Sequence, residues 1–309
     1  MIYNNILDAV GHTPLVRLNR MPEPGSAEIL VKMEGLNVGG SIKTRTALNM
    51  IEQAEKDGLI REDTIIVEPT SGNQGIGLAL VGAVKGYRTI IIMPDSVSEE
   101  RRKLVRHYGA DVKLIHDAGD IGACIEECLN TALRMQEENP KVFVPQQFAN
   151  INNTMAQKNF TAREILEQAE GPIHGFCSGI GTGGTITGIG EVLREHNPDL
   201  EIWAVEPENA AILAGGTIGT HMQMGIGDGI IPDILNREIY DDIYVVTDEE
   251  AIETSKRLAR EEGLMVGISS GTNVAAALKL AKKLGPGKRV VTILPDTAER
   301  YFSTPLFGE

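Results

Sequence analysis

Short apolar runs alternate with longer amphipathic stretches along most of the chain. In the first half these runs are bounded by turn residues, which is typical of buried parallel strands. The stretches between them have the apolar spacing of helices, and Gly86 and Gly109 stand where two of the helices should end. The expected strands are residues 64–68, 88–93, 111–115 and 141–144, and the expected helices are 73–86, 98–109 and 119–139.

The second half repeats the alternation of strand and helix. Thr247 and Glu250 have the spacing of a capping box at the start of one helix, and a long stretch around 207–240 shows no regular period. Two series of this kind predict an α/β protein with two doubly wound α/β domains that meet near residues 145–155. The expected strands are 172–178, 201–206 and 290–295, and the expected helices are one that runs through Arg194, 247–263 and 271–285.

The composition fits a globular protein that binds small molecules. The chain has 309 residues, of which 42% are hydrophobic, so it can bury a large core in roughly two domains. Its 29 Lys and Arg against 43 Asp and Glu give a net charge of −14. That balance argues against a nucleic-acid-binding protein, because phosphate neutralisation needs clustered basic residues.

Targeting and metal-binding signals are weak in this sequence. The first 20 residues lack the basic and then apolar pattern of a secretion signal, and no run approaches the roughly 18 apolar residues of a membrane span. We therefore expect a cytoplasmic protein. Cys124 and Cys128 lie on one face of an expected helix with no histidine nearby, so we interpret them as packing residues and expect no metal site.

A glycine-rich loop, GIGTGGT at 179–185, lies between an expected strand and helix. Successive backbone N–H groups in such a loop, with a helix N-terminus behind them, suit a phosphate group. Gly179, Gly181 and Gly184 also match a dinucleotide-binding fingerprint, with Glu206 at the position expected for the ribose contact. The loop therefore favours either a phosphate monoester, through Thr182 and Thr185, or an NAD-type cofactor.

Lys43 follows a Gly-Gly-Ser sequence at the start of an expected helix. A helix N-terminus disfavours an ammonium group, so the pKa of Lys43 should be lowered. A neutral amine is what Schiff-base chemistry requires, although a solvated surface lysine has the same local pattern.

The segment EPTSGNQG at 68–75 joins a strand to a helix. Thr70, Ser71 and Asn73, with the backbone N–H groups of the turn, would form a second anion site suited to a substrate carboxylate. A simple helix cap is the alternative interpretation. Two anion sites and a candidate amine nucleophile suggest a cofactor phosphate in one site and an amino acid in the other.

The chain resembles the fold-type II pyridoxal-phosphate enzymes, which have the fold of the tryptophan synthase β subunit, and among them the cysteine synthase (O-acetylserine sulfhydrylase) family. The resemblance runs almost from end to end, which weakens the NAD alternative. It implies a smaller domain from residues 1–12 and 36–149 and a larger one from 13–35 and 150–309. The motifs that carry it are GHTPLVRLN at 11–19, PTSGN at 69–73, MPDSVSEERR at 93–102, PQQF at 145–148, GTGGT at 181–185, AVEP at 204–207, GISSG at 267–271 and ERYFSTPLF at 299–307.

The resemblance implies roles for individual residues. Lys43 would form the Schiff base with pyridoxal 5′-phosphate and later move the α-proton, and Asn73 would contact the 3′ oxygen of the ring. Ser269 would face the pyridine nitrogen, and a neutral hydroxyl there favours β-elimination over reactions that need a stronger electron sink. The implied phosphate loop is Gly181, Thr182, Gly183, Gly184 and Thr185, and the implied substrate carboxylate contacts are Thr70, Ser71, Asn73, Gln74 and Gln147.

The implied reaction is β-replacement through an aminoacrylate, with O-acetyl-L-serine or another activated serine and sulfide giving cysteine. Departures from the family pattern cluster where substrate should lie, at Val38, at Gln74, in residues 151–158 and at Asp228. Asp228 stands where a small neutral residue is usual, so it is either a turn residue or a group that activates water or binds a second ammonium. The alternative activity is therefore sulfide release from L-cysteine, giving serine or a thioether amino acid such as lanthionine.

The same resemblance implies two protein partners. One is a second copy of the chain in a homodimer, and the other is the C-terminal tail of serine acetyltransferase, which docks in the active site of some family members. A purely binding role would leave Lys43 unused, so an enzyme is the favoured interpretation.

Overall fold

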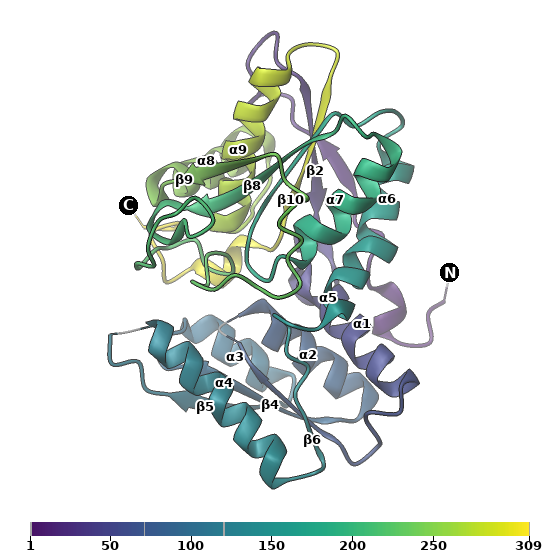
Figure 1. The fold of residues 1–309 in the computed structure, drawn as a ribbon, viewed down its shortest axis with the longest axis vertical. Helices are drawn as coiled ribbons and strands as arrows, with labels where there is room; N and C mark the ends of the chain where they lie inside the picture. Colours follow the sequence, from purple (N-terminus) through teal and green to yellow (C-terminus); the bar gives the residue numbers. More distant parts are fainter. Residues whose placement is uncertain (1, 71, 120, 309) are drawn as a thin grey trace.

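The computed structural model describes residues 2–70, 72–119 and 121–308. Its strands form two sheets, which lie in the upper and lower halves of Figure 1. The strands are β1 (Leu15–Arg17), β2 (Glu28–Met33), β3 (Ile65–Pro69), β4 (Arg88–Pro94), β5 (Asp111–Ile115), β6 (Val142–Phe143), β7 (Gly175–Gly179), β8 (Glu201–Pro207), β9 (Asp242–Val246) and β10 (Arg289–Leu294). The helices are α1 (Lys43–Lys56), α2 (Asn73–Lys85), α3 (Glu99–His107), α4 (Ile121–Glu138), α5 (Ile151–Ala156), α6 (Ala162–Gln168), α7 (Gly184–His196), α8 (Asp248–Glu262) and α9 (Ile268–Leu284).

The smaller sheet has four parallel strands in the order β5-β4-β3-β6. Successive residues of a strand point to opposite faces, so the apolar runs of β3 and β4 bury both faces of the sheet. Ile66 and Ile91 pack with α1, α2 and α3, while Val67 and Ile92 pack with Cys128 and the rest of α4. Helices on both faces confirm a doubly wound sheet.

The larger sheet has the order β1-β2-β10-β7-β8-β9, and only β1 is antiparallel to its neighbour. Ile29 and Val31 of β2 face the helices α8 and α9, whereas Leu30 faces α6 and α7. This second doubly wound sheet confirms the predicted fold class. The exact boundaries of the two domains stay a prediction.

Most expected elements lie where the apolar pattern placed them, with α2 ending at Gly86 in the left-handed conformation at φ +83° and Thr247 capping α8. Three strands were absent from the sequence prediction: β1, β2 and β9. The helix expected from residue 271 begins earlier, at Ile268, so that Ser269 lies in its first turn.

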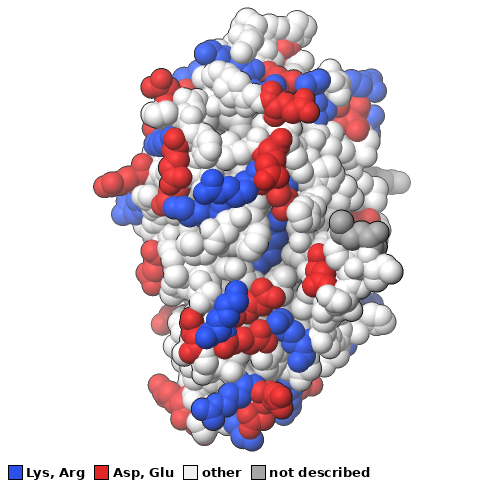
Figure 2. Space-filling view, turned by 90° about the vertical axis from the view of Figure 1, so that its right-hand side faces the viewer, with Lys and Arg blue, Asp and Glu red and all other residues white. Residues whose placement is uncertain are grey.

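The described surface carries charges of both signs. Figure 2 shows acidic and basic side chains next to one another on one face, without a large patch of either sign. None of the described helices is both long enough and apolar enough to cross a membrane.

Candidate active site

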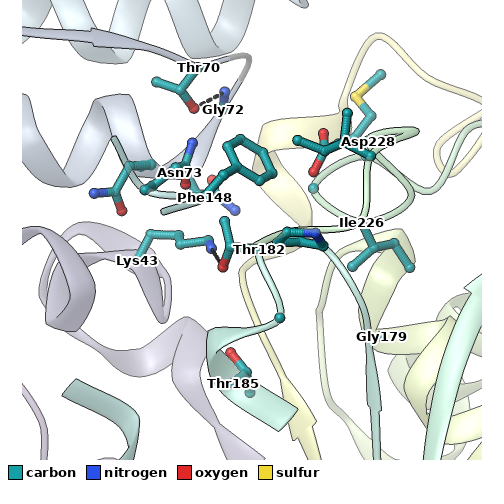
Figure 3. A pocket seen from close by; sticks show the side chains of 18 of the residues that line it. Lys43, Thr70, Gly72, Asn73, Phe148, Gly179, Thr182, Thr185, Ile226 and Asp228 are labelled. Carbon is teal, nitrogen blue, oxygen red and sulfur yellow. Dashed lines mark hydrogen bonds between the residues drawn. The ribbon is translucent and has the colours of Figure 1, made fainter. Parts of the chain in front are cut away.

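A cavity of about 320 Å³ opens where strands of both sheets end (Figure 3). Its wall includes Glu68 and Pro69 at the carboxyl end of β3 and Ser178 and Gly179 at the carboxyl end of β7. Ligands of open parallel sheets bind at this edge, because the loops that follow the strands converge there. The topology therefore brings together residues that are more than 100 positions apart in the sequence.

Nearly all of the predicted site residues line this cavity. Gly184 lies directly behind it as the first residue of α7, and Ser71 lies outside the described residues. The predicted residues in the cavity wall are Lys43, Thr70, Asn73, Gln74, Gln147, Gly181, Thr182, Gly183, Thr185, Asp228 and Ser269.

Lys43 is the first residue of α1 and points across the cavity toward the glycine-rich loop (Figure 3). Its Nζ donates a hydrogen bond to Thr182 Oγ1 at 3.4 Å. Burial disfavours the ammonium form and lowers the pKa of Lys43 to about 8, although the nearby carboxylates of Asp228 and Glu68 oppose the shift. The pKa thus falls as the sequence predicted, but burial is the cause that the geometry supplies.

The glycine-rich loop presents unpaired backbone N–H groups at the start of α7. None of the backbone N–H groups from Gly181 to Thr185 donates a hydrogen bond to a described residue. The N-cap residue of α7 is Gly183, so no side chain of the described residues accepts a hydrogen bond from the first N–H groups of this helix. A Cβ at Gly181 would lie 2.5 Å from the Gly225 carbonyl oxygen, so no larger residue fits there. Free N–H groups at the start of a helix, with the hydroxyls of Thr182 and Thr185, suit a phosphate monoester.

The loop after β3 offers a second set of donors. Gly72 donates its N–H to Thr70 Oγ1 at 3.3 Å, which closes the turn. The N–H groups of Asn73 and Gln74, at the start of α2, donate to no described residue, and α2 has no side-chain cap. This helix N-terminus can bind a carboxylate.

The amide of Asn73 is held by the C-terminal segment. Arg300 Nη1 donates to its Oδ1 at 2.5 Å, and its Nδ2 donates to Asp296 Oδ2 at 2.7 Å. Tyr301 also donates to Asp296 Oδ2, at 2.8 Å. These contacts orient the Asn73 side chain, and none of their members except Asn73 was predicted from the sequence.

Glu68 is a buried carboxylate in the cavity wall that sequence reasoning missed. It accepts the N–H groups of Gln146 at 2.9 Å and Gln147 at 2.8 Å, and thereby holds the PQQF segment against β3. Burial raises the pKa of Glu68 to about 7, in spite of these hydrogen bonds and the charge of Lys43. Its place at the end of an apolar strand, directly before the TSGN turn, was the available sequence signal.

Gln74 lies differently from the other predicted carboxylate contacts. It is buried, and its Nε2 lies 3.8 Å from Met50 Sδ in α1, while its Oε1 has no partner among the described residues. Asn153 is a further residue that the sequence did not single out. Its Nδ2 donates to Thr182 Oγ1 and to the Gln147 carbonyl, each at 2.8 Å, and so connects the glycine-rich loop with the PQQF segment.

Asp228 faces the cavity from the irregular stretch that precedes β9 (Figure 3). Its Oδ2 lies 3.6 Å from the position that a Cβ at Gly181 would occupy. Burial raises the pKa of Asp228, and the charge of Lys43 opposes this shift. His221 supports the turn, because its Nε2 bonds to the Gly227 carbonyl at 3.0 Å and its Nδ1 accepts the Gln223 N–H at 3.1 Å.

Glu206 does not have the freedom that a dinucleotide site would require. Its two carboxylate oxygens accept the N–H groups of Leu213 at 2.9 Å and Ala214 at 3.0 Å. Glu206 therefore anchors the irregular stretch to the end of β8. This geometry removes the residue that the NAD alternative needed for the ribose.

Comparison with known proteins agrees with this geometry. Residues 6–296 match the family described as pyridoxal-phosphate dependent enzyme. A cysteine synthase of Staphylococcus aureus is 47% identical over 306 residues, covering 99% of this chain and 97% of that protein. The crystal structure of O-ureido-L-serine synthase superposes with a TM-score of 0.93 at 42% identity, covering 99% of this chain and 96% of the other.

A second solved structure is a hydrogen sulfide-producing enzyme from Fusobacterium nucleatum, with a TM-score of 0.91, 41% identity, and coverage of 97% of this chain and all of the other. Matches of this length and identity extend through both sheets and the whole cavity wall. The chain belongs to the family of pyridoxal-phosphate dependent enzymes and is related throughout its length to the cysteine synthases.

Proposed function

We propose that this enzyme catalyses β-replacement on an activated serine, and that O-acetyl-L-serine and sulfide give L-cysteine and acetate. The bond between the β-carbon and the acetate oxygen breaks, and acetate leaves as an anion with the bonding electron pair. Hydrosulfide (HS−) supplies the electron pair of the new carbon–sulfur bond and the proton of the thiol, so atoms and charge balance. The observation that carries the proposal is the amine of Lys43, with a pKa of about 8, between two loops of free N–H donors. The cysteine synthase relatives support it.

The glycine-rich loop fits the phosphate of the cofactor. Residues 181–185 supply unpaired N–H groups and two hydroxyls, and Gly181 leaves no room for a side chain that would block them. We assign the ring contacts to Asn73 and Ser269, which line the same cavity. Bound pyridoxal phosphate supplies an electron sink that makes the α-proton of an amino acid acidic.

The other residues position the substrate and move its protons. Thr70 and the N–H groups of Asn73 and Gln74 would hold the substrate carboxylate, with Gln147 on the facing wall. Lys43 would remove the α-proton as a general base, which its lowered pKa favours near neutral pH. Thr182 holds the amine on the cofactor side of the cavity.

A second candidate activity starts from L-cysteine, and Asp228 is the observation that favours it. Its carboxylate faces the cavity, and burial raises its pKa, which makes it a stronger base than an exposed aspartate. With water as the second substrate, the products would be sulfide and serine; with a second cysteine, they would be sulfide and lanthionine. The sulfide-producing relative supports this alternative.

Product analysis separates the two activities. The purified protein with pyridoxal phosphate should convert O-acetyl-L-serine and sulfide to cysteine, and Lys43→Ala should abolish this turnover. Sulfide release from L-cysteine alone would favour the second activity, and Asp228→Asn should then slow it. Glu238→Gln is the matched control, because Glu238 is an exposed acid of the same irregular stretch and does not line the cavity. Absence of both activities would contradict the proposal.

We further propose a homodimer in the cytoplasm, with two domains divided as the sequence predicts, and a cavity that can also accept the C-terminal tail of serine acetyltransferase. The resemblance to the family supports these points. Sedimentation of the purified protein tests the dimer. Competition between a tail peptide and O-acetyl-L-serine tests the partner, and failure to compete at saturating peptide would reject it.

A further inference from the structure

Arg101, in α3, is a buried cation in the cavity wall with an unusual set of partners. Arg101 lines the cavity, and only 3% of the residue is exposed to solvent. Its Nη1 donates to Met224 Sδ at 2.7 Å, and its guanidinium carbon lies 5.2 Å from the centre of the Tyr301 ring. Its Nε has no partner among the described residues.

No described carboxylate forms an ion pair with Arg101. Arg45 of α1, which is buried to a similar degree, has two carboxylates, from Glu34 and Glu164. A buried guanidinium with a thioether and a ring face as partners retains most of its capacity to bind an anion. The positive charge of Arg101 is therefore not paired with a described carboxylate, and a ligand carboxylate could form this ion pair.

Arg101 and Asp228 lie on different walls of the cavity. Arg101 Nε is 3.5 Å from the position that a Cβ at Gly72 would occupy, which puts it beside the loop after β3. Asp228 is beside Gly181 in the glycine-rich loop. The two charges line one cavity and form no ion pair with each other, although the charge of Arg101 acts on Asp228.

We propose that Arg101 and Asp228 bind the second substrate as a zwitterion, and that this substrate is a thiol amino acid. Arg101 would hold its carboxylate and Asp228 its ammonium group, so that the thiol is directed to the β-carbon. The first substrate has its own carboxylate site at the N–H groups of Asn73 and Gln74. This inference rests on the proposed β-replacement and adds a thiol amino acid to sulfide as an acceptor.

A series of acceptors with O-acetyl-L-serine as donor tests the proposal. L-Homocysteine carries both charges, 3-aminopropanethiol lacks the carboxylate, and 4-mercaptobutyrate lacks the ammonium. We expect kcat/KM to be about tenfold or more higher for L-homocysteine than for either analogue, since each charged hydrogen bond contributes on that order. Mass spectrometry of the thioether products gives the rates.

The Arg101 and Asp228 variants should act on different analogues. Arg101→Gln should lower the ratio of kcat/KM for L-homocysteine to that for 3-aminopropanethiol by about tenfold. Asp228→Asn should lower the ratio of kcat/KM for L-homocysteine to that for 4-mercaptobutyrate by a similar factor. Arg101→Lys keeps the charge and should restore part of the selectivity, and Arg106→Gln removes an exposed arginine of the same helix as the control.

Three outcomes would overturn the proposal. Equal loss for every acceptor would mean that Arg101 only packs α3 against Tyr301. A rise in KM for O-acetyl-L-serine instead of the acceptor would assign Arg101 to the first substrate. If the wild-type enzyme uses sulfide but does not discriminate among the thiols, only the acceptor site is wrong, whereas failure with sulfide as well contradicts the proposed function itself.

Discussion

The amine of Lys43 has a lowered pKa because it lies in a cavity with few polar partners. Neutral amine is the form that reacts with an aldehyde, so the rate at which the cofactor-free enzyme takes up pyridoxal phosphate should rise with pH and level off above about 8. Stopped-flow absorbance of the cofactor band measures this profile. A profile that still rises at pH 10 would mean that Lys43 is solvated.

The carboxylate of Asp228 acts on the pKa of Lys43 in the opposite direction to burial. Its negative charge raises the pKa of Lys43, so Asp228→Asn should move the midpoint of the cofactor-uptake profile to lower pH. Glu238→Gln, which removes an exposed acid outside the cavity wall, should leave the midpoint in place. An unchanged midpoint in Asp228→Asn would show that the two groups do not interact.

The raised pKa of Glu68 should make the stability of the folded protein depend on pH. Its pKa is raised to about 7 in the folded protein and is near 4.5 when unfolded, so the folded state binds the proton more tightly. The resulting stabilisation is complete below about pH 4.5 and is lost as the pH rises to about 7. Glu68→Gln cannot ionise, so its free energy of unfolding relative to wild type should increase by up to about 3 kcal/mol between pH 5 and pH 8.

Urea unfolding of both proteins at the two pH values measures this difference. Glu62→Gln, an exposed acid before β3, is the control. A difference that does not change with pH would mean that Glu68 has an ordinary pKa in the folded protein.

Local sequence predicted Lys43 and the two loops that now line one cavity, because each prediction depends on a short contiguous segment. It missed Glu68, Asn153 and Arg101 because the function of each depends on contacts with distant parts of the chain. Asn153, for example, bonds to Thr182 and Gln147, and only the packing of α5 against both loops brings these groups together.

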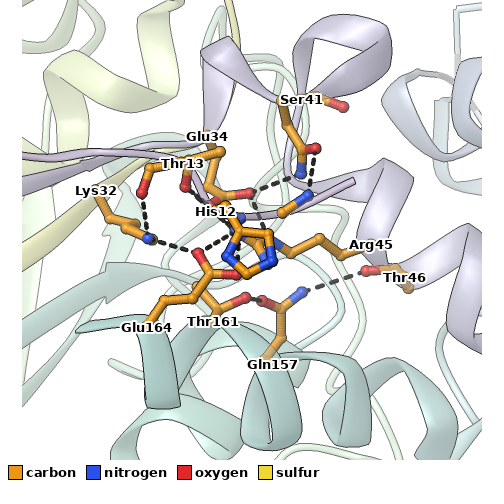
Figure 4. A network of polar contacts seen from close by, with 12 residues as sticks. His12, Thr13, Lys32, Glu34, Ser41, Arg45, Thr46, Gln157, Thr161 and Glu164 are labelled. Atoms are coloured by element: carbon orange, nitrogen blue, oxygen red, sulfur yellow. Dashed lines mark hydrogen bonds and ion pairs between the residues drawn. The ribbon is translucent and has the colours of Figure 1, made fainter. Parts of the chain in front are cut away.

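Buried ion pairs join three elements behind the active site (Figure 4). Arg45 of α1 bonds to Glu34 at 2.8 Å and to Glu164 of α6 at 2.6 Å, and Glu164 also pairs with Lys32 of β2 at 2.7 Å. Thr13 donates to Glu34 Oε1 at 2.6 Å. Because α1 begins at Lys43, this network holds the helix that carries the amine.

Removal of Arg45 should therefore destabilise the protein strongly. Arg45→Met would leave buried carboxylates without their cation, which costs roughly 3–5 kcal/mol. The control is Arg88→Met, which breaks an exposed pair with Asp111 and should cost at most about 1 kcal/mol. Urea unfolding measures both, and similar losses would contradict the role assigned to the network.

The same network gives a pH dependence. The cations beside it lower the pKa of Glu164 to about 2, from 4.5, in spite of its burial. Its contribution to stability is present above about pH 4.5 and is lost as the pH falls toward 2. Glu164→Gln should remove this part of the acid dependence, and an acid-unfolding curve of unchanged shape would exclude it.

The predicted strands include 111–115, which has Lys113 inside its apolar run. β2 has a similar pattern around Lys32 and was nevertheless missed, and only the Glu164 partner from a distant helix explains a buried lysine there. β9 was missed because it is a partly exposed strand at the edge of the sheet, with weaker apolar patterning. Both failures have the same origin, since tertiary contacts decided what the local pattern left open.

For the whole molecule, the two sheets differ in how their strands follow one another along the chain. The smaller sheet uses residues 65–143 and is contiguous in sequence. In the larger sheet, Glu28 of β2 pairs with Arg289 of β10. β2 therefore cannot form this pairing until β10, the last strand in the sequence, has been synthesised. β10 also joins β2 to β7, and without it the remaining strands form two separate pieces.

This arrangement sets an order of events on the ribosome. The smaller sheet can fold while the second half of the chain is still being made, whereas β2 has no neighbour except β1 until β10 leaves the exit tunnel. A stalled chain that ends at Val246 should resist protease over residues 65–143 and be cleaved between 15 and 33. Premature termination near the end of the message should then give a half-folded product with an exposed apolar strand, a natural substrate for chaperones and proteases.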